Sequence, residues 1–319
     1  MSTSPDYLVR RLRLRHLELL VAIAEARTMR AAASRLHLSQ PALSKMLGEV
    51  EAGFGARLFE RSPQGLSANA LGKAVTYRAR VMLAELARGK DEVDALRTGA
   101  EGVLRVGTLS VTAAVPQAVV QLRERMPGAR VQIQEGRVRD MIQRLLDGEL
   151  DCVFGAITPE LLTSGLLALL HPELLLEDEL CVLCATEHAL ARKRKLRWAD
   201  LHAVPWVAPP RDTLVRQALM TAFLNAGLEP PEPAIEVLSS VTVSSVLRSD
   251  PALVAAVRFE HARDELARGG VRRLLVSPVM PLPSLGLYTR RAAEAPAPLV
   301  QAFAQALRGV GVRPRMPAK

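Results

Sequence analysis

The first part of the chain has apolar residues at helical spacing. Over residues 12–25 they recur every three or four positions, which predicts an amphipathic helix. A second, short helix is expected from Thr28, a residue type that caps helix N-termini, to Leu36. After a short break, Ser39 provides the cap of a third helix, in whose first turn Pro41 is tolerated. This succession predicts a helix-turn-helix.

The third helix is expected to have two unlike faces. One is apolar at positions i, i+3, i+4 and i+7 and must turn inward; its residues are Leu43, Met46, Leu47 and Val50. The opposite face is slim, polar and singly basic; its residues are Gln40, Pro41, Ser44, Lys45 and Gly48. Such a face suits the major groove of DNA, where Gln and Lys side chains hydrogen-bond base edges. An ordinary solvated helix surface fits the same pattern.

A turn-rich segment follows this helix. Arg57 and Arg61 flank the sequence Leu-Phe-Glu, and Ser-Pro-Gln-Gly comes next at residues 62–65. This composition is typical of a wing, a small hairpin beside a recognition helix that contacts phosphate. The wing favours the DNA-binding interpretation of the third helix.

A heptad pattern runs through the next segment. Its positions alternate at spacings of four and three residues; they are Val75, Ala79, Met82, Leu86, Gly89, Val93 and Leu96. Such a seam is typical of a helix that pairs with a copy of itself. A surface helix packed on its own domain is the alternative, and Gly89 costs about 1 kcal/mol relative to Ala inside a helix. Residues 98–102, Thr-Gly-Ala-Glu-Gly, then predict a hinge.

From Val103 onward, predicted strands alternate with predicted helices. The first set has strands at 103–106, 131–134 and 151–156 and helices at 115–125 and 137–147. The second set begins near Glu177, with strands at 180–185, 206–208, 235–237 and 253–257 and helices at 212–226 and from about 240. A strand at 285–289 and a helix at 298–307 close the body. This order predicts an α/β fold with a largely parallel sheet, behind an all-α-type N-terminal module.

Charge is unevenly distributed along the 319 residues. The formal net charge is +9, and the first eighty residues hold 13 Lys and Arg against 6 Asp and Glu, so the remainder is close to neutral. A basic N-terminal module predicts a polyanionic partner. No apolar stretch approaches the ~18 residues that a membrane helix needs. The absence of a signal-peptide pattern and an odd number of cysteines favour the reducing cytoplasm.

Two stretches resemble the winged helix-turn-helix of LysR-type transcriptional regulators: residues 28–44, TMRAAASRLHLSQPALS, and residues 58–61, LFER. Two places depart from the family pattern. Val50-Glu51 replaces the usual Leu-Glu, and residues 66–72 are longer than the usual Leu-Thr-x-x-Gly. The resemblance, with the face described above, implies DNA contacts by Thr28, Arg30, Ser39, Gln40, Pro41, Ser44, Lys45 and Arg61. Of these, Gln40, Pro41, Ser44 and Lys45 are expected at bases, and Arg30, Ser39 and Arg61 at phosphates.

The resemblance extends over essentially the whole chain and implies its domains. They are a winged helix-turn-helix over residues 1–69, a dimerisation helix with a hinge over 70–101, and an effector domain over 102–319. The effector domain would be two-lobed and similar to periplasmic solute-binding proteins, with lobe I at about 102–172 and 277–319 and lobe II at about 173–276. The implied partners are double-stranded promoter DNA, further copies of the chain in a homodimer or homotetramer, RNA polymerase and a small-molecule effector. No cofactor is implied.

In such folds a ligand binds between the lobes, at the carboxyl ends of strands. Three hydroxyls follow the first strand, and Arg137 follows the second, where many relatives have a small hydroxyl residue. Residues 209–216 resemble a Pro-Pro-x-Gly-Thr-x-x-Arg segment of some relatives, with Asp212 replacing the glycine. The candidate effector-binding residues, which alternatively cap helices and bridge the lobes, are Thr108, Ser110, Thr112, Arg137, Pro210, Arg211, Thr213 and Arg216. Their cations predict an anionic effector, a carboxylate or an aromatic acid.

Other chemistry is disfavoured by the sequence. Cys181 and Cys184 have the spacing of a redox motif but lie in a predicted strand, where i and i+3 side chains point to opposite faces. The six histidines have no metal-ligand spacing, so no metal site is predicted. No nucleophile, base and orienting group converge, which argues against an enzyme. A solute-binding module without DNA function is the main alternative, and the helix-turn-helix argues against it.

Overall fold

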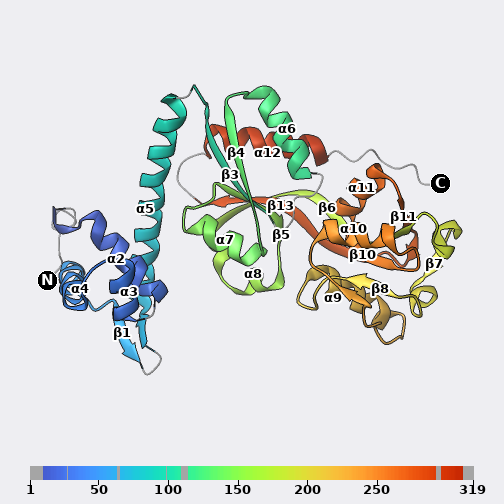
Figure 1. Cartoon of the computed structure of the whole chain (residues 1–319), viewed down its shortest axis with the longest axis horizontal. Coiled ribbons are helices and arrows are strands. Elements are labelled where there is room, and N and C mark those ends of the chain that lie inside the picture. The colour runs from blue at the N-terminus through green and yellow to red at the C-terminus, as the bar shows by residue number, and fades with distance from the viewer. Residues whose placement is uncertain are drawn as a thin grey trace. The chain divides into compact units, whose positions relative to one another are not determined.

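A computed structural model of the chain describes residues 10–26, 28–62, 65–97, 99–108, 114–291 and 296–311. The chain divides into two compact units, an N-terminal unit and a larger body that comprises residues 101–145 and 151–319. Figure 1 shows both units and labels most of their elements. Each unit has a hydrophobic core of its own.

The N-terminal unit consists of helices and one hairpin. Its elements are α2 (Leu14–Ala26), α3 (Met29–Arg35), α4 (Gln40–Phe54), β1 (Phe59–Ser62), β2 (Gly65–Ala68) and α5 (Ala70–Arg97). The side chains of Thr28 and Ser39 cap α3 and α4 by accepting hydrogen bonds from the backbone N–H groups of Ala31 (3.2 Å) and Ala42 (3.3 Å). Strands β1 and β2 pair in antiparallel fashion. The predicted helix-turn-helix with a wing is therefore confirmed.

One apolar cluster fixes α4 relative to the wing. Leu43 and Val50, on the predicted inner stripe of α4, share this cluster with Leu58 at the start of the wing. The carboxylate of Glu51 accepts hydrogen bonds from the backbone N–H groups of Leu58 (2.7 Å) and Phe59 (3.3 Å). Packing is closest at Gly72 of α5, where a Cβ atom would lie 1.9 Å from the carbonyl oxygen of Leu58. Residues 66–72 depart from the family pattern, but the segment still ends in a glycine, which the packing against Leu58 requires.

Helix α5 is continuous across the glycine of the heptad seam. The seam begins inside the N-terminal core, where Ala79 is 1% exposed. Further along, the seam residues Met82, Leu86 and Val93 are 56%, 55% and 48% exposed. An apolar stripe of this kind on a 28-residue helix has no covering partner among the described residues of this chain.

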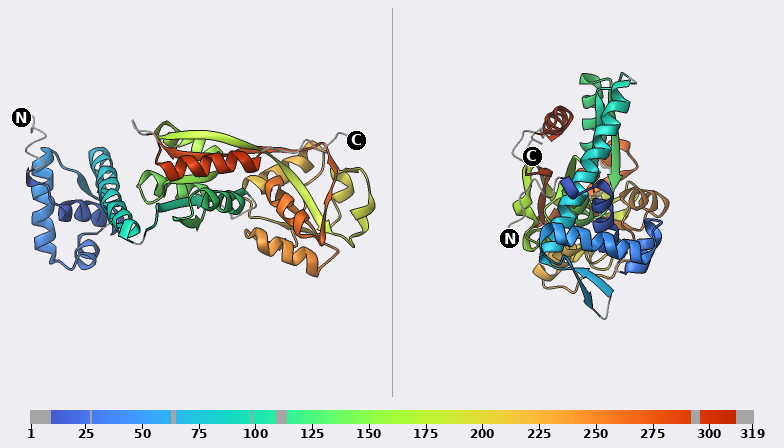
Figure 2. Two further views of the ribbon diagram at one scale, coloured as in Figure 1. Left: turned by 90° about the horizontal axis from the view of Figure 1, so that it is seen from above. Right: turned by 90° about the vertical axis from the view of Figure 1, so that its left-hand side faces the viewer.

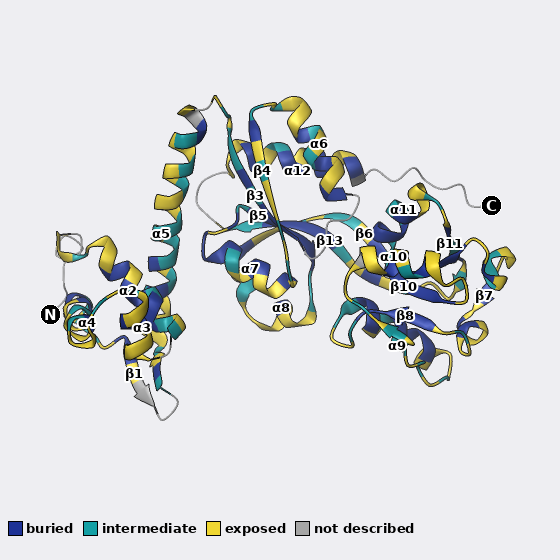
Figure 3. Ribbon diagram, in the orientation of Figure 1, coloured by how far each residue is buried: buried dark blue, intermediate teal, exposed yellow. Residues whose placement is uncertain are grey.

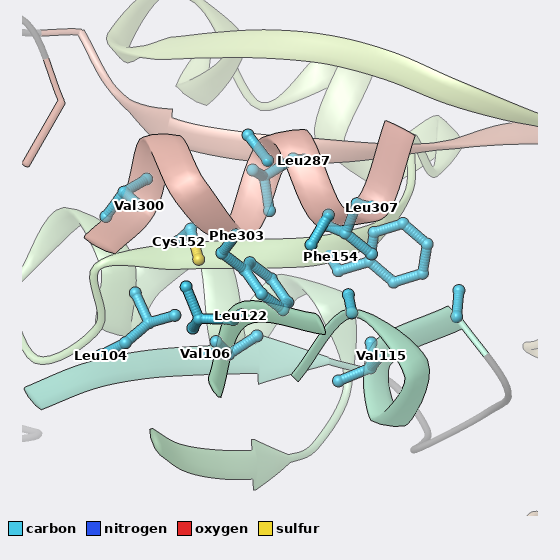
Figure 4. Packing of buried hydrophobic residues seen from close by; sticks show 14 of the residues in the cluster. Leu104, Val106, Val115, Leu122, Cys152, Phe154, Leu287, Val300, Phe303 and Leu307 are labelled. Atoms are coloured by element: carbon cyan, nitrogen blue, oxygen red, sulfur yellow. The ribbon is translucent and has the colours of Figure 1, made fainter. Parts of the chain in front are cut away.

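Lobe I of the body is a sheet with helices on both faces. Its elements are β3 (Gly102–Thr108), α6 (Ala114–Arg125), β4 (Ala129–Glu135), α7 (Val138–Leu146), β5 (Cys152–Ala156), α8 (Pro159–Thr163) and α12 (Pro298–Gly311). Strands β4, β3 and β5 are parallel, as expected. On one face, Phe303 and Leu307 of α12 pack with Leu122 of α6 and Phe154 of β5 (Figure 4). Helix α7 covers the other face, where Val138 contacts Gly155.

Lobe II repeats this arrangement. Its elements are β7 (Leu196–Arg197), β8 (Trp206–Ala208), α9 (Leu214–Asn225), β9 (Ile235–Glu236), α10 (Ser240–Ser249), β10 (Val254–Arg258), α11 (Phe259–Arg268), β11 (Val271–Leu274) and β12 (Val276–Ser277). Helix α9 covers one face of the sheet, and α10 and α11 cover the other. The sequence did not predict α11 or β11.

Two long strands run through both lobes. They are β6 (Leu170–Ala185) and β13 (Pro281–Arg290), which pair with each other in antiparallel fashion (Figure 2). Within the described residues they complete a nine-stranded sheet in the order β4-β3-β5-β13-β6-β10-β8-β9, with β11 also paired to β6. The expected strand at 180–185 is therefore only the second half of β6. Residues 173–176 still pair with β13 beside β5, so the strands cross between the lobes a few residues later than expected.

The three cysteines are buried in these sheets. Cys181 and Cys184 belong to the clusters on opposite faces of lobe II, as strand geometry predicted. Burial raises the pKa of Cys181 to about 12 and that of Cys184 to about 11, and it also raises the pKa of Cys152. These thiols are protonated at neutral pH and do not have the exposed thiolate that redox sensing needs.

Thiol labelling tests this assignment. At pH 8 in the native chain we expect the cysteines to react with an aromatic disulfide reagent about 100-fold more slowly than in the denatured chain, where their pKa values return to the ordinary range. The reaction is followed by the absorbance of the released thiolate. A cysteine that reacts at the denatured rate in the native chain would contradict burial as the controlling factor.

Candidate functional site

The outer face of α4 is exposed along its length. Gln40, Pro41, Ser44 and Lys45 are all solvent-exposed, whereas Leu43 on the inner stripe is fully buried. Figure 3 colours the ribbon by burial, with exposed residues in yellow and buried ones in dark blue. Because Ser39 caps the helix and the inner stripe is locked in the core, these four side chains are presented on a rigid support. The polar face predicted from the sequence is thus one continuous surface of the helix.

The other predicted DNA contacts lie at the edges of the same unit. Thr28 and Arg30 are exposed at the start of α3, and Ser39 is exposed at the start of α4. The hydroxyl groups of Thr28 and Ser39 are already engaged as helix caps. The backbone of Arg61 pairs with Leu66 in the wing, while its side chain lies outside the described part of the structure.

The body contains a cavity of about 620 Å³ between its two lobes. It opens at the carboxyl ends of β5, β8 and β10, where ligands bind in open α/β sheets. Lobe I lines it with Arg137, Val138, Arg139, Asp140, Ala156, Thr158, Pro159 and Glu160. Lobe II lines it with Pro209, Asp212, Thr213, Leu214, Val215, Gln217, Val237, Leu238, Val243, Ala256, Val257, Arg258 and His261. Its lining is largely apolar, with three arginines balanced by three carboxylates.

Only some of the predicted effector residues reach this cavity. Arg137 and Thr213 line it. Thr108 does not; it is 2% exposed at the end of β3, where its carbonyl accepts a hydrogen bond from Gly136 N–H (3.0 Å). Ser110 and Thr112 lie outside the described residues. Thr213 also caps α9 by accepting from the backbone N–H of Arg216 (3.2 Å), which is the alternative role considered for it.

Pro210, Arg211 and Arg216 are not among the residues that line the cavity, contrary to expectation. Both arginines instead pair with Glu232, which lies in the loop after α9. Arg211 lies in the turn before α9 and Arg216 in the first turn of the helix, and the guanidinium groups of both reach Glu232 instead of the cavity. Arg216 is 2% exposed, so it is part of the packed structure of lobe II.

Arg137 and Asp212 form an ion pair across the mouth of the cavity. They lie one in each lobe, and both are places where the predicted effector-binding segments depart from the family pattern. Their side chains are 62% and 52% exposed. An exposed pair of this kind contributes about 0–1 kcal/mol, so it is readily exchanged for another partner.

The start of α11 makes polar contacts with both strands that cross between the lobes. The Asp178 carboxylate on β6 pairs with Arg258 and accepts a hydrogen bond from the backbone N–H of Phe259 (3.0 Å). Arg258 also donates to the carbonyl of Pro283 on β13 (3.0 Å). This turn is therefore anchored to both crossing strands.

His261, in the same turn, lies at the wall of the cavity. Its Nε2 is 3.2 Å from the hydroxyl of Ser244 on α10, and both residues are buried. The same hydroxyl hydrogen-bonds the carboxylate of Glu265, which also accepts from Arg248 (2.7 Å). Burial alone would raise the pKa of Glu265, but the hydrogen bonds from Arg248 and Ser244 outweigh it and lower that pKa. Burial lowers the pKa of His261, so its ring is neutral near pH 7.

This grouping of Ser, His and carboxylate was not anticipated from the sequence. The direction of its hydrogen bonds differs from that in a hydrolase triad, where the His removes the Ser proton. An ionised carboxylate can only accept, so the Ser244 proton is donated to Glu265. His261 then donates its Nε2 proton to Ser244 instead of removing one. Ser244 is also only 1% exposed, so a substrate could not reach its hydroxyl. The grouping supports the cavity wall and does not form a nucleophile.

The residues of α11 are the ones that sequence reasoning missed. A usable signal existed: Glu260 lies in the first turn, Arg268 in the last, and Gly269 directly after, which is the charge and capping pattern of a helix.

In the ranges that the structure describes, no cluster of three or more His, Cys, Asp or Glu could hold a metal ion. Across those same ranges, no helix has the length and apolar content to cross a membrane.

Comparisons with known proteins match both units. The model of the bacterial regulatory helix-turn-helix protein, lysR family, matches residues 14–73, and the LysR substrate binding domain matches residues 97–311. The chain is 31% identical over 254 residues to the HTH-type transcriptional regulator GbpR of Azospirillum brasilense, covering 78% of this chain and 73% of that protein. It is 30% identical to the regulator GalR of Pseudomonas putida, covering 86% of this chain and 68% of that protein.

Solved structures share the fold. The crystal structure of CbnR, a LysR family transcriptional regulator, has a TM-score of 0.60 at 22% identity and covers 95% of this chain and 100% of its own. Full-length CbnR complexed with its target DNA has a TM-score of 0.59 at 22% identity, covering 93% and 99%. A helix-turn-helix with a wing, a long helix and a two-lobed α/β body therefore occur together here as they do in those regulators, and the chain belongs to the LysR family of DNA-binding transcriptional regulators.

Proposed function

We propose that the protein binds promoter DNA as a dimer or tetramer through α4 and the wing, and that a small anionic metabolite held between the two lobes controls it. The observation that carries the DNA part is the rigid, exposed face of α4 formed by Gln40, Pro41, Ser44 and Lys45. Its slim side chains admit close approach to base edges, and Gln and Lys supply the hydrogen bonds. Arg30, Ser39 and the wing arginine Arg61 lie where phosphate contacts would fix the register.

The exposed part of α5 supports self-association. Met82, Leu86 and Val93 leave an apolar stripe uncovered, and burial of such a stripe against a second copy stabilises a coiled pair. Two copies present two recognition helices, which doubles the number of base and phosphate contacts. Assembly of dimers into a tetramer and contact with RNA polymerase are proposed from family membership.

The interlobe cavity supports a small effector with an acidic group. Its largely apolar lining suits a compact metabolite, and Arg137 already pairs with a carboxylate, that of Asp212, at the mouth. Because this pair is exposed and weak, a ligand carboxylate can take the place of Asp212 on Arg137. The lobes then gain a bridge through the ligand, and a change in lobe closure alters the geometry with which the dimer meets DNA.

Gel-shift titration tests the groove assignment. We expect Gln40→Ala and Lys45→Ala each to weaken binding to the promoter fragment about 10-fold or more, since a good base contact is worth ~1–3 kcal/mol. Lys90→Ala is the matched control, because Lys90 is an exposed lysine on α5 paired with Asp94. Unchanged affinity in both α4 variants would refute the assignment and favour a solute-binding module without DNA function.

Sedimentation velocity tests the seam. Leu86→Glu places a charge in the apolar stripe and is expected to shift the chain toward monomer, because burying an unpaired carboxylate is strongly unfavourable. Leu71→Glu is the control, since Leu71 is 56% exposed on the same helix but outside the heptad positions. An unaltered oligomer in Leu86→Glu would show that association uses another surface.

A thermal-shift screen of small aliphatic and aromatic carboxylates against the full chain tests the cavity. A bound acid at 100-fold its Kd stabilises the folded state by ~2.7 kcal/mol, enough to move Tm by several degrees. We expect Arg137→Ala to reduce this shift and Arg211→Ala, which lies outside the lining, to leave it intact. A shift that is lost in Arg211→Ala but retained in Arg137→Ala would contradict binding in the cavity and place the ligand near Arg211.

A further inference from the structure

One buried carboxylate joins the two lobes directly. Glu260, in the first turn of α11 in lobe II, accepts a hydrogen bond from the backbone N–H of Ala114, the first residue of α6 in lobe I, at 2.6 Å. Glu260 is 5% exposed and Ala114 is fully buried. The contact therefore lies inside the protein, unlike the exposed pair at the cavity mouth.

The acceptor suits its position. The first N–H groups of a helix have no acceptor within the helix, and the positive end of the helix dipole favours a carboxylate there. A cap of this kind usually comes from the residue just before the helix. Here a carboxylate from the other lobe, 146 positions away in sequence, makes the contact.

Glu260 is also held in place from its own side. The preceding residues Arg258 and Phe259 bind Asp178 of β6, so α11 begins at a fixed point on the crossing strands. His261, the next residue, lines the interlobe cavity. Four consecutive residues thus connect the crossing strands, the opposite lobe and the cavity wall.

We propose that Glu260 is a tethered acid that holds lobe II against the N-terminus of α6 and thereby keeps the lobes closed without any bound ligand. The closed arrangement of the lobes is then stabilised by a contact within the chain, in addition to any stabilisation by a bound effector. Loss of the carboxylate leaves the buried N–H of Ala114 without this acceptor, and the lobes separate there to admit water.

The test compares Glu260→Ala, Glu260→Gln and, as a matched control, Glu236→Ala, which removes an exposed glutamate of lobe II. Spin labels are placed on the full chain at Val120→Cys in α6 and Leu224→Cys in α9, which are 59% and 60% exposed. The native thiols are buried and do not compete for the label. Labelled chain is diluted with unlabelled chain so that distances within one molecule are measured.

We expect Glu260→Ala to broaden and lengthen the interlobe distance distribution and to lower Tm by about 5 °C. Sodium acetate, compared with sodium chloride at equal ionic strength, is expected to recover part of both changes in this variant. Glu260→Gln keeps an acceptor oxygen and should retain the closed distance, as should Glu236→Ala. Neither of these two should respond to acetate.

Two results would overturn the proposal: a wild-type distance distribution in Glu260→Ala, or an opening that acetate does not reverse. If Glu260→Ala fails to fold, Glu260→Asp replaces it, because one methylene less prevents the carboxylate from spanning to Ala114. A closed, acetate-insensitive Glu260→Asp then has the same meaning as a closed Glu260→Ala.

Discussion

The body of this protein depends on one antiparallel ladder, the pairing of β6 with β13. Both strands pass between lobe I and lobe II, so the two chain crossings between the lobes form one hydrogen-bonded ribbon. The register shifts between Leu282 and Leu285 and again between Leu285 and Gly286, where the ribbon passes from one lobe to the other. Because the ribbon fixes both lobes at one edge, the carboxyl ends of their strands face each other and enclose the cavity.

Charge in the cavity is organised by pairing. Arg258 is neutralised by Asp178 at the ribbon, and Arg137 by Asp212 at the mouth. The two pairs differ in consequence, because Asp178 is buried and structural while Asp212 is exposed and exchangeable. The exposed pair therefore leaves Arg137 with a partner that is readily exchanged, whereas the buried pair of Arg258 is fixed.

Much of the architecture follows from local pattern. The inner stripe of α4, the caps Thr28 and Ser39, and the heptad seam of α5 are encoded within a few neighbouring residues, and in α4 this periodicity specifies which face turns inward. The βαβ order of lobe I is encoded in the same way. The opposite orientation of Cys181 and Cys184 also follows from the two-residue period of a strand.

The interlobe cavity was harder to predict because its walls come from distant parts of the chain. Sequence reasoning placed Arg211 and Arg216 beside the ligand, but both pair with Glu232, which follows α9 in the chain. It missed α11, whose charged surface hides a short apolar face, and so missed Glu260 and its partner in α6. By itself, the sequence determined the helix-turn-helix, its exposed polar face and the α/β class, since these rest on local periodicity and capping. Only the tertiary structure decided which charges neutralise one another across the lobes, because that depends on contacts between residues far apart in the chain.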